Sequence, residues 1–125
     1  MSKTILIVDD EQIIVDITKR KLTQEGYMVI GVGDGAQALQ VLREGAVDLI
    51  VLDVEMPNMN GYTFMTERQK IPGASSVPVI VLTAYDSMEP IFKRHGIRAY
   101  LQKPLQFQDL LVKIREVLCV QGVCG

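Results

Sequence analysis

Three carboxylates follow apolar segments of this chain at points where buried strands would end. Asp9 and Asp10 follow the segment Thr4–Val8, and Asp53 follows the segment Leu49–Leu52. Because the carboxyl ends of parallel strands meet at one edge of a sheet, these side chains are predicted to lie together. Two carboxylates about 5 Å apart repel by roughly 3 kcal/mol at an effective dielectric constant of about 20, so a bound cation is implied. Carboxylate and carbonyl oxygens suit Mg²⁺, or Mn²⁺ in its place.

A hydroxyl and an ammonium group are predicted at the same edge. Thr83 ends the apolar segment Val79–Leu82, and Lys103 comes shortly after the segment Ala99–Leu101. A carboxylate can attack phosphorus if the charge on the phosphoryl oxygens is neutralised, which a metal on one side and Lys103 on the other would achieve. The pattern therefore predicts a site for a metal ion and a phosphate at this edge of the sheet.

Each of these residues also has an ordinary structural role. An aspartate after a strand is often a turn former or a helix cap, and Asp10 or Glu11 suits the first turn of a helix. Thr83 is a common strand residue, and a lysine is commonly exposed to solvent. These roles do not explain why acids, a hydroxyl and an ammonium group converge on one edge, so we favour the phosphoryl-transfer site.

Apolar segments of strand length alternate with segments of helical period, which is typical of a parallel sheet covered on both faces. The predicted strands are Thr4–Val8, Tyr27–Val32, Leu49–Leu52, Val79–Leu82 and Ala99–Leu101. The residues predicted on the inner faces of the first, second and last helices are Ile14, Ile17 and Leu22; Ala38, Leu39 and Leu42; and Phe107, Leu110, Leu111, Ile114 and Leu118.

Length and composition predict a single domain over residues 1–125, with a core of about residues 3–118 and a tail of 119–125. Thirteen basic and fifteen acidic residues give a net charge of -2, so direct nucleic-acid binding is not expected. Because no apolar run approaches the roughly 20 residues that span a bilayer, and no secretory signal is present, we expect a cytoplasmic protein that does not enter the membrane.

Four motifs, "LIVDDE", "LIVLDVEMPNMNG", "VIVLTA" and "YLQKP", occur in this order between Lys3 and Leu118. In sequence and spacing the chain resembles the receiver domain of two-component response regulators. The resemblance implies an α/β fold, a doubly wound five-stranded parallel sheet of order 2-1-3-4-5 that is flavodoxin-like. It also implies that Asp53 is the phosphoacceptor and that Asp9, Asp10, Asp53 and the backbone carbonyl of Glu55 hold Mg²⁺.

The resemblance assigns roles to further residues. Thr83 and Lys103 would contact the phosphoryl oxygens, and Tyr100 would be the aromatic residue that follows the conformational switch. Glu55 and Tyr85 would flank the approach of water and so tune dephosphorylation. The implied phosphodonor is a sensor histidine kinase or a histidine phosphotransfer protein, and the implied output is an unknown protein target, with the chain a monomer or a phosphorylation-dependent dimer. Such a domain is a signalling phosphoacceptor and not an enzyme.

Two other functions remain as alternatives. An aspartyl-phosphate hydrolase would use Asp53 and Glu55 as nucleophile and acid-base pair, and would turn over phosphate esters repeatedly. A dinucleotide-binding oxidoreductase would use "GVGDGA", but Asp34 would place negative charge where the pyrophosphate should bind. The chain also departs from the receiver pattern between Thr83 and Lys103, where the segment is short and predicts a truncated fourth helix.

Overall fold

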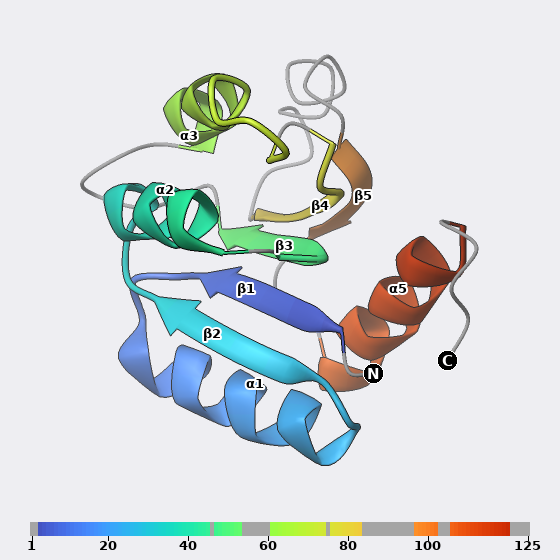
Figure 1. The fold of residues 1–125 in the computed structure, drawn as a ribbon. Helices are drawn as coiled ribbons and strands as arrows, with labels where there is room; N and C mark the ends of the chain where they lie inside the picture. Colours follow the sequence, from blue (N-terminus) through green and yellow to red (C-terminus); the bar gives the residue numbers. More distant parts are fainter. Residues whose placement is uncertain are drawn as a thin grey trace.

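Five parallel strands form the single sheet of this computed structural model, which describes residues 3–45, 47–53, 61–74, 76–83, 97–102 and 106–120. The strands are β1 (Thr4–Val8), β2 (Met28–Val32), β3 (Leu49–Asp53), β4 (Val79–Thr83) and β5 (Ile97–Gln102). They lie in the order β2-β1-β3-β4-β5 (Figure 1). The predicted doubly wound sheet and its strand order are therefore confirmed.

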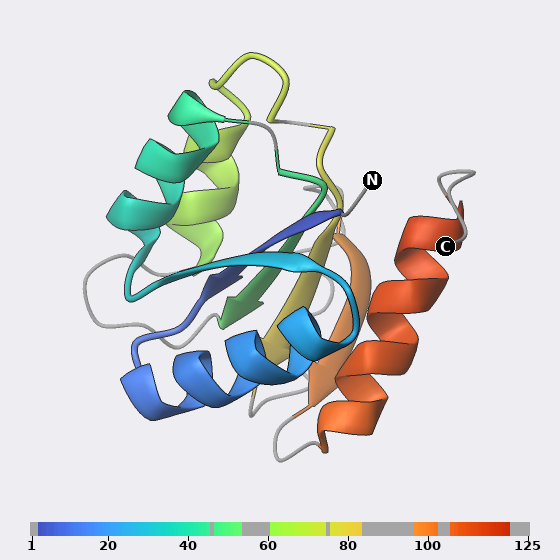
Figure 2. The same cartoon turned by 60° about the horizontal axis from the view of Figure 1, so that its bottom comes forward.

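The described helices cover both faces of the sheet. They are α1 (Gln12–Gln24), α2 (Gly35–Glu44), α3 (Gly61–Arg68) and α5 (Phe107–Val120). Figure 2 shows α1 and α5 on one face and α2 with α3 on the other. Among the described residues, none of these helices has the length and apolar character that crossing a membrane requires. The truncated fourth helix was predicted within residues 84–96, which lie outside the described ranges.

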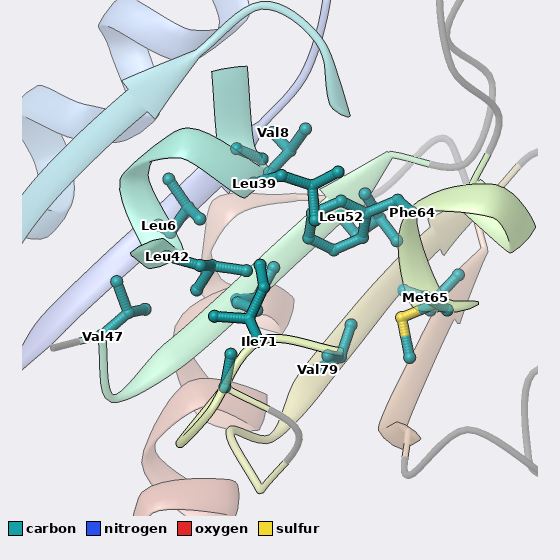
Figure 3. Packing of buried hydrophobic residues seen from close by; sticks show 14 residues of the cluster. Leu6, Val8, Leu39, Leu42, Val47, Leu52, Phe64, Met65, Ile71 and Val79 are labelled. Carbon is teal, nitrogen blue, oxygen red and sulfur yellow. The ribbon is translucent and has the colours of Figure 1, made fainter. Parts of the chain in front are cut away.

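The central strand β3 is buried along its whole length, as its unbroken apolar run predicts. Leu52 packs in a cluster with Phe64 and Met65 of α3 (Figure 3), and Ile50 belongs to the same cluster. Leu49 and Val51 point to the opposite face, where α1 and α5 pack. Each fully buried leucine or isoleucine stabilises the fold by about 1.5–3 kcal/mol, so the two clusters fix the strand on which Asp53 lies.

Helix α1 presents a different face to the sheet from the one predicted. Leu22 is buried as expected, but Ile14 and Ile17 are 43% and 47% exposed, and Val15 is buried in their place. The prediction of Ile14 and Ile17 as inner residues is therefore wrong. Val15 is the residue that packs against β2, because Gly31 leaves space for its side chain.

Gly31 permits this close approach of α1 and β2. A Cβ atom at Gly31 would lie well inside van der Waals contact with Cγ1 of Val15. Gly31→Ala is therefore expected to destabilise the domain by about 1–3 kcal/mol through overpacking. Urea unfolding measures the change, and the same substitution in a Val15→Ala background should cost clearly less. An equal cost in both backgrounds would show that Val15 is not the obstacle.

Candidate metal and phosphoryl site

The sheet topology brings the strand ends that carry the acids together. Strands β1 and β3 are parallel neighbours, and Val8 of β1 is paired with Leu52 of β3. The residues that follow Val8 and Leu52 therefore lie at the same edge of the sheet. Asp9 and Asp10 leave the end of β1, and Asp53 is the last residue of β3. The predicted convergence of these three residues is what the structure shows.

The three carboxylates are close enough to share one cation. One oxygen from each of Asp9, Asp10 and Asp53 lies within 4.8 Å of the other two. Asp9 and Asp53 are only 4% and 2% exposed, whereas Asp10 is exposed to solvent. Because burial strengthens the repulsion between like charges, this arrangement is costly without a positive charge among the oxygens.

Hydrogen bonds fix the orientation of Asp9. Its carboxylate Oδ1 accepts a hydrogen bond of 2.9 Å from the backbone N–H of Glu11. Its own N–H donates to the carbonyl of Val32 at 3.1 Å, which ties the loop after β1 to the end of β2. The bond to the Glu11 N–H is the turn-forming role that the sequence allowed for an aspartate after a strand, whereas the bond to Val32 depends on the neighbouring strand and was not predicted.

The acids are not used as caps of the following helix. Glu11 occupies the N-cap position of α1, but its side chain makes no capping hydrogen bond, and the first turn contains no acidic residue. The side chain of Asp10 is exposed beside the other two carboxylates. A capping hydrogen bond therefore does not explain Asp10 or Glu11, although Glu11 lies at the N-terminus of α1, where the helix dipole favours an acid.

The remaining predicted site residues are placed only in part. Thr83 ends β4 next to β3, where Asp53 pairs with Leu82, and so reaches the same edge of the sheet. Tyr100 lies in β5 and pairs with Val81. The structure describes the backbone of Thr83 and Tyr100 but not their side chains, while Glu55, Tyr85 and Lys103 lie outside the described residues.

In the glycine-rich segment that suggested a dinucleotide site, nearby side chains already bind the backbone N–H groups. Asp34 caps α2 and its carboxylate accepts the N–H of Gln37 at 2.8 Å. The Gln37 Oε1 in turn accepts the N–H of Gly33 at 2.8 Å. Two backbone donors that a pyrophosphate would need are thus occupied, and a carboxylate stands at the helix start.

The donor set at the acidic site fits a hard divalent cation. Among the residues that the structure describes, Asp9, Asp10 and Asp53 are the group of acids, histidines or cysteines close enough to hold a metal ion. All three offer oxygen ligands, and the partly open position of Asp10 leaves room for water. Mg²⁺ prefers such a set, because it binds through a few carboxylates and keeps several waters.

Comparison with known proteins gives one consistent family. A family model described as the response regulator receiver domain matches residues 5–115. TcrX, a probable transcriptional regulatory protein of Mycobacterium tuberculosis, is 33% identical over 125 residues, which cover 96% of this chain and 51% of TcrX. This chain therefore spans about half the length of that relative.

Solved structures agree with the family model. A CheY-like response regulator receiver domain protein from Methanospirillum hungatei matches with a TM-score of 0.89 and 33% identity, and 98% of each chain is covered. The response regulator TrrA from Thermotoga maritima, solved in complex with Mg²⁺ and BeF, matches with a TM-score of 0.80 and 33% identity over 93% of this chain and 99% of TrrA.

Proposed function

Because the chain belongs to the response regulator receiver family, we propose that Asp53 accepts a phosphoryl group from a phosphohistidine donor and that this modification switches the domain. The observation that carries the proposal is the burial of Asp53 at the end of the central strand, beside two further carboxylates. The donor would be a sensor histidine kinase or a histidine phosphotransfer protein.

The proposed reaction transfers a phosphoryl group from the donor to the side chain of Asp53. An oxygen of Asp53 forms the new bond to phosphorus while the bond from phosphorus to the donor's imidazole nitrogen breaks, and the imidazole keeps the electron pair. Asp53 is held in place by buried neighbours, because it follows Leu52 in β3 and pairs with Leu82 of β4. A fixed carboxylate favours the in-line approach to phosphorus that the transfer needs. Transfer is thus a matter of positioning and charge.

We assign the metal ligands to Asp9, Asp10, Asp53 and the backbone carbonyl of Glu55. A bound Mg²⁺ supplies positive charge that offsets the carboxylates and the incoming phosphoryl oxygens. The hydrogen bond from the Glu11 N–H to Oδ1 of Asp9 holds this carboxylate beside the other two acids. Support comes from the mutual distances of the three acids and from their oxygen donors.

Asp10→Asn tests the metal assignment. Removing one of three negative charges is expected to weaken Mg²⁺ binding about tenfold or more, and to raise the stability of the metal-free domain slightly through relief of repulsion. Isothermal titration calorimetry with Mg²⁺ measures the affinity. The matched control is Asp16→Asn, an exposed acid of α1 outside the cluster, which should bind Mg²⁺ as the wild type does. Equal affinity in Asp10→Asn and the wild type would reject Asp10 as a ligand.

Three residues would read the phosphoryl group, and two would set its lifetime. We assign Thr83 and Lys103 to contacts with the phosphoryl oxygens and Tyr100 to the switch that follows. Glu55 and Tyr85 would control the approach of water to phosphorus. What supports these roles is the motif match to the family and the position of Thr83 at the end of the strand beside β3.

The domain would act stoichiometrically rather than as a turnover enzyme. The relatives carry names of transcriptional regulators, and about half of TcrX lies beyond the part matched here. We therefore propose that the phosphorylated domain controls a protein target or an attached output segment in the cytoplasm, without touching nucleic acid itself.

Incubation with Mg²⁺ and an acyl phosphate, followed by intact-mass analysis and peptide mapping, tests this function. A receiver takes up at most one phosphoryl group, on Asp53, and releases it slowly. A hydrolase would instead consume the phosphodonor through many turnovers with little adduct. A modification mapped to another residue, or sustained turnover of phosphate esters, would contradict the proposal.

A further inference from the structure

Strand β2 is an edge strand that lacks the usual protection against pairing. It is the outermost strand of the sheet in Figure 1 and pairs with β1 on one side. Residues 26–33 contain no charge and no proline, the features that commonly block an exposed edge. Met28 and Ile30 are 62% and 37% exposed on the same face of this strand. An apolar, uncharged edge of this kind favours pairing with another strand.

The open backbone groups of β2 are confined to two residues. The N–H of Met28 donates to Lys3, and the carbonyl of Val32 accepts from Asp9, so residues 28, 30 and 32 face β1. Residues 29 and 31 therefore present their N–H and C=O groups outward. On either side of them the N–H groups are already bonded, that of Tyr27 to the carbonyl of Leu22 and that of Gly33 to Oε1 of Gln37.

We propose that β2 pairs antiparallel with β2 of a second copy of this chain, about a two-fold axis at Ile30. In this register Val29 of one copy lies opposite Gly31 of the other, and each such pair exchanges two backbone hydrogen bonds. The two pairs use the outward N–H and C=O groups of both residues in both copies. The edge is therefore complementary to itself, which is why we infer a second copy as the occupant.

The side chains agree with the same register. Ile30 lies opposite Ile30 of the second copy, and Met28 lies opposite Val32, so apolar residues pair on the face where Met28 and Ile30 are now exposed. On the other face Val29 of one copy lies opposite Gly31 of the second copy. Gly31 has no side chain, so the space beside it remains filled by Val15 of its own chain. A slip of one residue would set open backbone groups against groups already bonded to β1.

Oligomeric state in the absence of any phosphodonor tests the pairing. Sedimentation equilibrium, extended to about 1 mM protein, is expected to show a reversible dimer. Ile30→Lys places two ammonium groups opposite each other and should weaken dimerisation at least tenfold. Val112→Lys introduces the same charge at an exposed apolar position of α5 and should leave the dimer intact. A monomeric wild type, or equal effects of the two lysine substitutions, would overturn the proposal.

Disulfide cross-linking tests the register itself. Residues opposite each other in the non-hydrogen-bonded position have Cα atoms about 4.5 Å apart, which permits a disulfide. Ile30→Cys should therefore form a cross-linked dimer on mild oxidation, with peptide mapping locating the bond at position 30 in both copies. Met28→Cys should not, because two-fold symmetry places its equivalents four residues apart along the pair. Cross-linking at position 28 as efficient as at position 30 would reject this register.

Discussion

Asp53→Asn is expected to abolish phosphorylation while leaving the domain folded. An amide of the same shape keeps the packing at the end of β3, but it lacks the anionic oxygen that attacks phosphorus. The substitution also removes one of three clustered negative charges, so the unfolding free energy of the metal-free variant should equal or exceed that of the wild type. Intact-mass analysis after incubation with Mg²⁺ and an acyl phosphate should show the adduct in the wild type alone.

Asp48→Asn is the matched control for this experiment. Asp48 precedes the same strand at its other end, where its carboxylate accepts the Thr4 N–H at 2.8 Å. An asparagine oxygen can still accept that hydrogen bond, so this variant should be phosphorylated as the wild type is. An adduct of undiminished yield in Asp53→Asn would mean that another residue is the phosphoacceptor.

Arg68→Ala is expected to destabilise the domain by about 3–5 kcal/mol. Arg68 is fully buried at the end of α3, and its Nη1 donates a 2.7 Å hydrogen bond to the carbonyl of Ala74. Burial lowers the pKa of the Arg68 guanidinium from its ordinary value, but arginine stays protonated at neutral pH. The substitution would leave a cavity and remove the donor to a carbonyl in the connection to β4. Urea unfolding monitored by circular dichroism measures the loss.

Arg43→Ala provides the comparison, because Arg43 is an exposed residue in the last turn of α2. Its replacement should change the unfolding free energy by no more than about 0.5 kcal/mol. If Arg68→Ala were equally mild, the hydrogen bond to Ala74 would not be holding the connection between α3 and β4.

Strand positions and the acidic site could be predicted from the sequence because both depend on local patterns. The apolar run of β3 must be buried on both faces, which places Asp53 at a strand end in the middle of the sheet. The inner face of α5 was predicted correctly, since Leu110, Leu111, Ile114 and Leu118 are buried and form one stripe.

Features that depend on contacts between distant elements could not be predicted in this way. The burial of Val15 in place of Ile14 and Ile17 depends on a glycine in the neighbouring strand. Buried Arg68 donates a hydrogen bond to a carbonyl six residues later in a turn, whereas a charged residue at a helix end normally suggests exposure. The contact of Asp9 with the backbone of Val32 likewise joins two strand ends that only the fold brings together.

The aspartates at the two ends of β3 have different kinds of contacts. At one end Asp48 serves the backbone of β1 through Thr4, and at the other Asp53 joins a cluster of repelling acids. Substitutions at Asp48 are therefore expected to affect mainly the stability of the fold, and substitutions at Asp53 mainly the proposed phosphorylation. We therefore expect substitutions near the acidic edge to alter the proposed phosphorylation while leaving the contacts of the opposite edge in place.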